Sequence, residues 1–315
     1  AGIYNPTVNV GKMVNKGFEL ELNYGNSISD FDYNIGLNLS TIHNEMLEAD
    51  PNQVLYGSAW KGNGHFVTQT LKGYPVASFW LYQTDGIFQN QEEVDAFYEM
   101  YYYTANGGVK PNNILPAPGE TGLNRLRPGA RKLVDLNGDG AITTEDLYYA
   151  GDAAPRLAFS IKAGLEWKGI DFSAFFQGIG KQVTLRTGSI YAPFVTNYTM
   201  QNSTFMGKTW TPENPDAQYT ILSRDNGFNR FNYENKDISV QNNRYIRLKS
   251  LVIGYSLPKQ WIAKAGLSKL RFYFSGDDLW EWTKIKDGYD PEHGEGGNNT
   301  FPFSRLITFG VDLTF

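Results

Sequence analysis

The chain has 315 residues, a formal net charge of −5 at pH 7 and no cysteine. Its acidic balance and the lack of a basic cluster exclude nucleic acid as an expected partner, and the missing cysteines exclude disulfides and cysteine metal sites. Aromatic residues make up 15% of the chain, although its mean hydropathy is −0.42. Many aromatic residues in a polar chain are typical of a transmembrane β-barrel, in which aromatic girdles surround a hydrophilic interior. No apolar run reaches the roughly 18 residues that a membrane helix needs.

Two stretches of alternating apolar and polar residues near the start predict a hairpin. The first runs from Phe18 to Tyr24 and the second from Phe31 to about residue 40, with a turn at residues 25–30. One face of this hairpin is apolar, whereas the other carries Glu19 and Glu21. Such glutamates fit the solvated surface of a β-sandwich and equally the lining of a water-filled barrel, so the hairpin leaves both folds open.

The same alternation returns twice along the chain. Residues 157–165 and 170–176 predict a second strand pair, and residues 244–257 and 270–274 predict a third. Within the stretch 244–257 the apolar residues change phase. This phase change predicts a β-bulge near Lys249 and Ser250.

The last strand is the most regular. Apolar residues alternate there with Thr308, Gly310, Asp312 and Thr314, and the apolar set is Ile307, Phe309, Val311, Leu313 and Phe315. A strand of an outer-membrane barrel turns apolar side chains to lipid and small polar ones to the lumen. We therefore expect the apolar set to face lipid and Thr308, Asp312 and Thr314 to face the lumen. A terminal strand of a soluble sandwich would show the same alternation.

The connections between these strands sort by length. Short ones (25–30, 166–169 and 258–269) alternate with long ones (about 41–155, 178–243 and 280–304). Within the first long connection we expect a strand-like patch from Ser78 to Gln89 and then a helix from Gln91 to about Tyr103. Strict alternation places all short turns at one end of the strands and all long loops at the other. That is the outer-membrane arrangement of short periplasmic turns and long extracellular loops.

The sequence therefore predicts an all-β fold, a transmembrane antiparallel β-barrel with about seven strands and long extracellular loops. Bacterial single-chain barrels have an even number of strands and at least eight. Seven strands do not close such a barrel alone. We expect residues 1–315 to be the C-terminal part of one larger barrel domain.

Residues 135–146 match the D-x-[DN]-x-[DN]-G half of a calcium-binding loop. Asp135, Asn137 and Asp139 supply oxygens at positions 1, 3 and 5, Ala141 offers its carbonyl at position 7, and Asp146 stands at position 12 in place of the usual glutamate. We expect these five residues to hold a structural Ca²⁺ ion that pins an external loop. An Asx/Gly turn without an ion is the alternative. A lone loop lacks the helix pair of calcium switches, so we expect no signalling role.

No catalytic motif stands out. The chain lacks serine-hydrolase, zinc-protease, P-loop and dinucleotide fingerprints, and its three histidines are far apart in sequence. We therefore expect no enzyme activity. Tryptophans of the loops are candidates for stacking on sugar rings, although Trp280 and Trp282 equally suit an interface girdle.

Seven short segments carry a family resemblance, and they lie at residues 15–22, 84–89, 135–140, 175–178, 244–249, 253–258 and 290–292. Together they resemble, in order, the C-terminal part of the SusC/RagA family of TonB-dependent outer-membrane transporters of Bacteroidetes. The resemblance implies a 22-stranded barrel, of which these residues would form roughly strands 16 to 22. It also implies an N-terminal plug and earlier strands outside these residues, a SusD-like surface lipoprotein as lid, and energy supplied by TonB.

Two functions fit the sequence. The first is import of oligosaccharides, with peptides as the alternative cargo, across the outer membrane of a Gram-negative, Bacteroidetes-like bacterium. The second is a secreted, calcium-stabilised β-sandwich that binds or processes glycans. A sandwich buries its apolar faces against each other, whereas a barrel exposes an apolar band about 25 Å tall to lipid.

Overall fold

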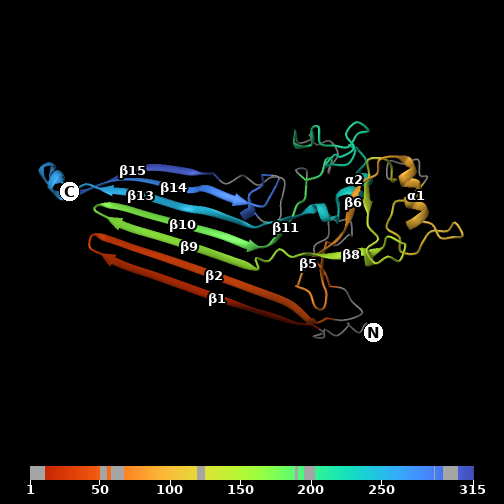
Figure 1. Ribbon diagram of the computed structural model, residues 1–315, viewed down its shortest axis with the longest axis horizontal. Coiled ribbons are helices and arrows are strands. Elements are labelled where there is room, and N and C mark those ends of the chain that lie inside the picture. The colour runs from red at the N-terminus through yellow and green to blue at the C-terminus, as the bar shows by residue number, and fades with distance from the viewer. Residues whose placement is uncertain are drawn as a thin grey trace, which may run out of the picture.

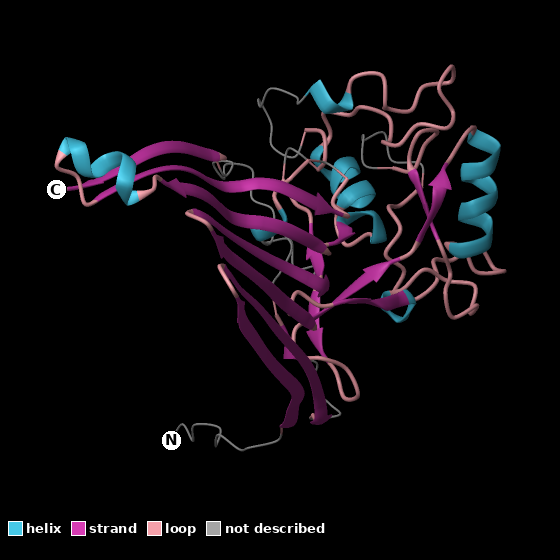
Figure 2. Ribbon diagram, turned by 60° about the vertical axis from the view of Figure 1, so that its left-hand side comes forward, coloured by secondary structure: helices cyan, strands magenta, loops and turns pink. Residues whose placement is uncertain are grey.

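The computed structural model describes residues 11–49, 55–57, 67–118, 125–188, 191–194, 203–286, 288–293 and 304–315. Its main feature is an antiparallel sheet in the order β1-β2-β9-β10-β13-β14-β15, in which each strand pairs with the next along the chain. The strands are β1 (Lys12–Ile28), β2 (Phe31–Glu48), β9 (Leu157–Trp167), β10 (Ile170–Lys181), β13 (Tyr245–Ser256), β14 (Lys269–Thr283) and β15 (Leu306–Thr314). The sheet is curved, with β1 and β15 at its two edges (Figure 2).

The short connections lie at one end of this sheet and the long ones at the other (Figure 1). Between β9 and β10, Lys168 and Gly169 both have positive φ, of 47° and 85°. Two such residues make the tight turn that matches the twist of a hairpin. Between β13 and β14 the chain forms the short helix α3 (Lys259–Ile262) and a 3₁₀ turn, η4 (Ala263–Ala265). The sorting of connections that the sequence predicted is therefore present.

The long connections fold together into what we call the loop region, the described residues between β2 and β9 and between β10 and β13. One small sheet has the order β3-β4-β5-β8, and two strand pairs are β6-β7 and β11-β12. Their bounds are β3 (Leu55–Tyr56), β4 (Thr68–Thr70), β5 (Ser78–Tyr82), β6 (Thr84–Ile87), β7 (Arg131–Leu133), β8 (Leu147–Gly151), β11 (Val183–Leu185) and β12 (Val240–Asn242). The helices are α1 (Gln91–Tyr101) and α2 (Asn226–Tyr233), with 3₁₀ turns η1 (Thr144–Asp146), η2 (Ser203–Phe205) and η3 (Asp237–Ser239); η5 (Pro291–His293) follows β14.

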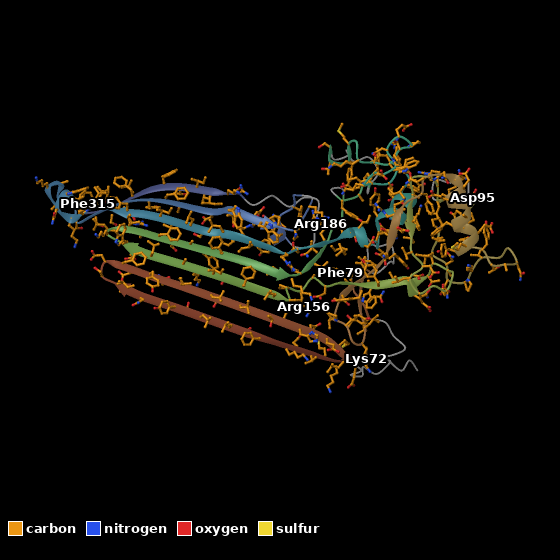
Figure 3. All side chains as sticks on the ribbon, in the orientation of Figure 1. Lys72, Phe79, Asp95, Arg156, Arg186 and Phe315 are labelled. Atoms are coloured by element: carbon orange, nitrogen blue, oxygen red, sulfur yellow. The ribbon has the colours of Figure 1, made fainter. Side chains whose placement is uncertain are left out.

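The hydrophobic core lies in the loop region. One buried cluster joins α1 and α2 through Val94, Phe88 and Phe228, and a second surrounds Phe79 and Leu81 of β5 (Figure 3). Helix α1 forms where the sequence predicted it. The Asn90 side chain caps it by accepting a hydrogen bond from the Glu93 amide at 2.9 Å.

Several strands extend farther than their apolar pattern predicts. β2 continues to Glu48, β10 to Lys181 and β14 to Thr283, so the expected loop starts at 41, 178 and 280 are too early. Beyond residue 41, β2 carries His43 and Glu45 at positions that are apolar earlier in the strand, and the alternation ends while the backbone pairing continues. The register of β13 against β14 shifts between Leu248 and Ser250, which confirms the predicted bulge.

Candidate functional site

One face of the seven-stranded sheet is apolar and exposed. Its exposed large side chains are Phe18, Leu22, Tyr24, Ile28, Phe31, Ile35, Ile161, Trp167, Ile170, Ile253, Tyr255, Phe272, Trp280, Trp282, Ile307, Phe309, Val311 and Leu313. We call this surface the apolar face. Phe309, for example, is 78% exposed. A sandwich would bury such a face, so the sandwich alternative does not fit.

Aromatic residues bound the apolar face along β14. Phe272 lies near its short-turn end, and Trp280 and Trp282 lie near its loop end. Ten residues separate Phe272 from Trp282, which is about 33 Å of strand and about 25 Å along a barrel axis at a tilt of about 40°. That height equals the apolar band of outer-membrane barrels. No helix among the described residues combines the length and apolar composition needed to cross a membrane.

The opposite face, which we call the polar face, carries an ion cluster near the short-turn end. Arg271 of β14 contacts Asp171 of β10 (Nη2–Oδ2, 2.6 Å) and Asp312 of β15 (Nη1–Oδ2, 3.0 Å). Gly254 of β13 lies between Arg271 and Asp171, and a Cβ there would stand 2.6 Å from the Arg271 Nε. A side chain at position 254 would separate the two charges, so this glycine lets them meet across β13.

A second cluster lies toward the loop end and surrounds Arg247, which is 1% exposed at its side chain. Its guanidinium contacts Glu281 of β14 (Nε–Oε2, 3.0 Å), Asp290 (Nη2–Oδ2, 2.7 Å) and Glu292 (Nη1–Oε1, 3.0 Å). Lys249 also contacts Glu292 (Nζ–Oε2, 3.1 Å). The chain after β14 is thereby held against β13. We call these residues the Arg247 cluster.

A cavity of about 510 Å³ adjoins the polar face over β1, β2, β9 and β10. Its polar lining includes Glu19, Glu21, Asn38, Ser160 and Gln177, and the Asn38 amide donates to the Ser160 hydroxyl at 3.3 Å. Carboxylate, amide and hydroxyl groups in one hollow suit a polar, hydrogen-bonding ligand.

The predicted calcium residues form one closed loop. Asp135 accepts hydrogen bonds from the backbone amides of Gly138 and Gly140, at 2.7 and 2.8 Å. Asn137 accepts from the Asp139 amide at 3.0 Å, and Asp139 accepts from the Ala141 amide at 2.8 Å.

Buried Asp146 closes the same loop. Its Oδ1 accepts from the Leu136 amide and its Oδ2 from the Thr143 amide, both at 2.8 Å. The structure thus brings position 12 of the motif back to its first residues.

The backbone of this loop has the shape of a calcium loop, but its side chains are not arranged as metal ligands. Successive Asx turns and glycines with positive φ at 138 and 140 form the tight turn that a calcium loop needs. Among the described residues, however, no three His, Cys, Asp or Glu side chains group as metal ligands do. The carboxylates turn toward backbone amides instead. Each oxygen of Asp135 accepts one such bond and keeps a second lone pair, whereas the Asp146 Oδ1 also accepts a bond from the Asn137 amide at 3.4 Å.

Lys236 is a buried charge in the loop region. Its ammonium donates to the Glu234 carbonyl at 2.8 Å and lies 5.2 Å from the ring centroids of Tyr82 and Phe231. Burial lowers the pKa of Lys236 from 10.5 to about 7, opposed by the negative charges of Glu234 and Asp237 and aided by the positive charge of Arg131.

Comparisons with known proteins agree with this architecture. No family model matches the chain. Over its whole length it is 27% identical to TonB-dependent receptors P3 and P26 of Formosa agariphila, and it covers 30% of each. Over 98% of its length it is 23% identical to the TonB-dependent receptor SusC of Bacteroides thetaiotaomicron, covering 27% of that protein. The chain is homologous to TonB-dependent receptors.

The solved RagAB peptide transporter shares the fold, with a TM-score of 0.67 and 20% identity over 98% of this chain and 30% of that one. The open-open state of the RagAB peptide importer gives a TM-score of 0.62 at 19% identity. The predicted resemblance to the C-terminal barrel portion of SusC/RagA receptors is thus confirmed, and so is an outer-membrane location. The chain spans about 30% of the length of the receptors that it matches.

The sequence did not predict either ion cluster. Residues 244–249, 253–258 and 290–292 carried the resemblance, and the structure shows that they supply Arg247, Gly254 and Asp290. A glycine inside a strand pattern marks close approach of another group, so Gly254 was the available signal. The partners of Arg247 lie up to 45 residues away along the chain, and no local pattern links them.

Proposed function

We propose that the chain forms the C-terminal wall and extracellular loops of a closed, about 22-stranded barrel that imports nutrients across the outer membrane. The observation that carries this proposal is the exposed apolar face opposite an ion-paired polar face. Edges β1 and β15 then pair with further strands of the same barrel. The short turns face the periplasm and the loop region faces outward.

Oligosaccharide is the proposed cargo, and peptide is the second candidate, favoured by the RagAB peptide transporter. We also propose a SusD-like lipoprotein as a lid over the loop region and TonB as the energy source, because the relatives are TonB-dependent receptors. The role proposed for the chain is transport rather than catalysis.

Membrane placement is tested with the full-length protein in outer membranes. Single cysteines at Phe309 and Val311 of the apolar face should react with a lipid-soluble maleimide, and cysteines at Thr308 and Asp312 of the polar face should react with a water-soluble one. The reverse pattern, or reaction of all four with the water-soluble reagent, would refute the barrel.

Partner and cargo are tested by affinity purification of the tagged full-length protein. A lipoprotein that co-purifies in near-equal amount supports the lid. Mass spectrometry of the small molecules released on denaturation should find oligosaccharides. Peptides there would favour the second candidate, and a deletion strain that grows normally on either nutrient would contradict import.

We further propose that the loop of Asp135, Asn137, Asp139, Ala141 and Asp146 binds one structural Ca²⁺ ion. The Asx turns support this, and the ion would supply the charge balance for carboxylates now held by amides alone. At 1 mM Ca²⁺ and a dissociation constant of about 10 μM, binding would add about 2.7 kcal/mol to the stability of the loop region. Calcium-dependent protection of residues 133–147 from hydrogen exchange, lost in D135N, is the expected result. Equal protection in calcium and in chelator would mean an ion-free turn.

A further inference from the structure

The connection between β13 and β14 presents an exposed tryptophan on a basic surface. Trp261 of α3 is 67% exposed, whereas Ile262 beside it is 4% exposed and anchors the helix. Lys259, Lys264 and Lys269 are also exposed, and residues 257–270 contain no Asp or Glu. This connection therefore adds three positive charges to a chain whose net charge is −5.

A neighbouring turn has the same chemistry. Between β9 and β10, Trp167 is exposed and the Lys168 ammonium lies 5.5 Å from its ring centroid. At this same end of the sheet, far from the loop region, stands Phe315 (Figure 3). The connection reaches it, because the Ser268 amide donates to the Thr314 carbonyl at 2.7 Å. Aromatic and cationic side chains thus gather at one rim.

Three lysines of this rim stand outside the ion pairs of the described part of the chain, although acidic residues such as Glu166 lie at the same end of the sheet. Lys168, Lys259 and Lys264 take part in none of these ion pairs, whereas Lys269 lies two residues before Arg271 on the polar face and its charge acts on Asp171. Arg271 nearby, by contrast, is paired with two aspartates. The three unpaired lysines are therefore available to an external anion.

The rim is continuous with the apolar face. Trp167 belongs both to the rim and to the apolar face, and Phe272 stands three residues beyond the end of the connection at position 269, which is about 10 Å of strand and about 8 Å along a barrel axis at a tilt of about 40°. The polar headgroup layer of a bilayer is about that thick, since the membrane measures about 40–45 Å with headgroups and about 30 Å without.

We propose that the α3 connection is an interfacial anchor that binds the phosphate groups of phospholipids in the leaflet at the short-turn end. Trp261 lies in the headgroup layer, where tryptophan is enriched, and Lys259 and Lys264 contact the phosphates. This inference rests on the proposed function, because it requires the apolar face to lie in a bilayer. A periplasmic protein is the competing occupant, but it would not account for the continuity with the apolar face.

Fluorescence quenching tests the placement of Trp261. The full-length protein is reconstituted into nanodiscs with phospholipids that carry a nitroxide on the headgroup or in the middle of the acyl chain. The emission of Trp261 is the difference between the emission of the wild type and that of W261F. The headgroup label should quench this emission more than the mid-chain label does. W210F is the matched control, because Trp210 is buried in the loop region and should not be quenched.

A third variant, W282F, separates this inference from the proposed function. If Trp282 is quenched and Trp261 is not, the barrel placement stands and the anchor is refuted. If neither is quenched, both proposals fail.

Lipid retention tests the lysines. Native mass spectrometry of K259Q/K264Q should show a roughly 25-fold weaker apparent affinity for phosphatidylglycerol, since one lysine near an anionic surface is worth about five-fold. K72Q/K208Q changes two exposed lysines of the loop region and should retain lipid normally. Unchanged retention in K259Q/K264Q, or loss of a co-purifying periplasmic protein instead of lipid, would overturn the proposal.

Discussion

Replacement of Arg247 by alanine should release the chain that follows β14 from the wall of the sheet. The Arg247 side chain is 1% exposed, and its carboxylate partners Glu281, Asp290 and Glu292 are 32%, 16% and 17% exposed. Removing one partner of a buried ion pair costs about 3–5 kcal/mol. Because these carboxylates are partly hydrated, we expect the lower limit of that range for R247A.

Hydrogen–deuterium exchange of the full-length protein measures this cost. A loss of about 3 kcal/mol, at 1.36 kcal/mol for each tenfold change, raises local opening about 150-fold. The increase should be confined to peptides that cover residues 281–293, and peptides of β1 and β2 serve as internal controls. Unchanged exchange in residues 281–293 would refute the reasoning.

A charge-neutral background separates electrostatics from packing. R247M keeps much of the side-chain volume, and alone it should behave like R247A. In the background E281Q/D290N/E292Q, R247M should change exchange by less than about fivefold, since no carboxylate is left unpaired there. An equal effect of R247M in both backgrounds would show that the arginine acts through packing and not through charge.

Two further variants test other contacts of the wall and the loop region. G254A should lower the free energy of unfolding in urea by roughly 1–3 kcal/mol through overpacking, because its Cβ would stand 2.4 Å from Asp171 and 2.6 Å from Arg271. G25A should leave the free energy of unfolding unchanged, because its Cβ would meet its nearest atom at 3.5 Å. Equal free energies for the two variants would contradict this role of Gly254. The pKa of Lys236 is about 7 in the folded protein and 10.5 in the unfolded chain. Between these pH values the unfolded chain binds one more proton than the folded protein, so the free energy of unfolding should rise with pH, by at most about 1.4 kcal/mol per pH unit. K236M should remove this dependence, and a wild-type midpoint that falls from pH 7 to 9 would show the sign to be wrong.

The seven long strands were predictable because each meets two different environments. Where one face is apolar and the other polar, the alternation appears directly in the sequence, as it does from Ile307 to Thr314. The pattern fails where a strand leaves those environments. β2 pairs with β1 as far as Glu48, but its outer positions His43 and Glu45 give no apolar signal.

The loop region could not be predicted in this way. β5 is buried along its whole length, so it shows no alternation, and its neighbours come from distant parts of the chain. The Arg131 amide, for example, donates to the side chain of Asn232 at 2.7 Å. Contacts between positions a hundred residues apart leave no periodic trace. The exceptions were the strand-like patch from Ser78 to Gln89, where β5 and β6 form, and the helix α1, whose capping residues are local.

The position of the two ion clusters also bears on cargo. Segments 244–249, 253–258 and 290–292, which carried much of the resemblance to SusC/RagA receptors, supply residues that tie β10, β13, β14 and β15 together on the polar face. Their charges are paired with one another, so these residues stabilise the sheet and are not available to bind a ligand. Under the proposed function, cargo selection would depend on other groups, such as the polar lining of the cavity beside Glu21 and Asn38 and the loop region above it. If that function holds, substitutions there should change which nutrient is imported, whereas substitutions in the clusters should change only how much folded protein reaches the membrane.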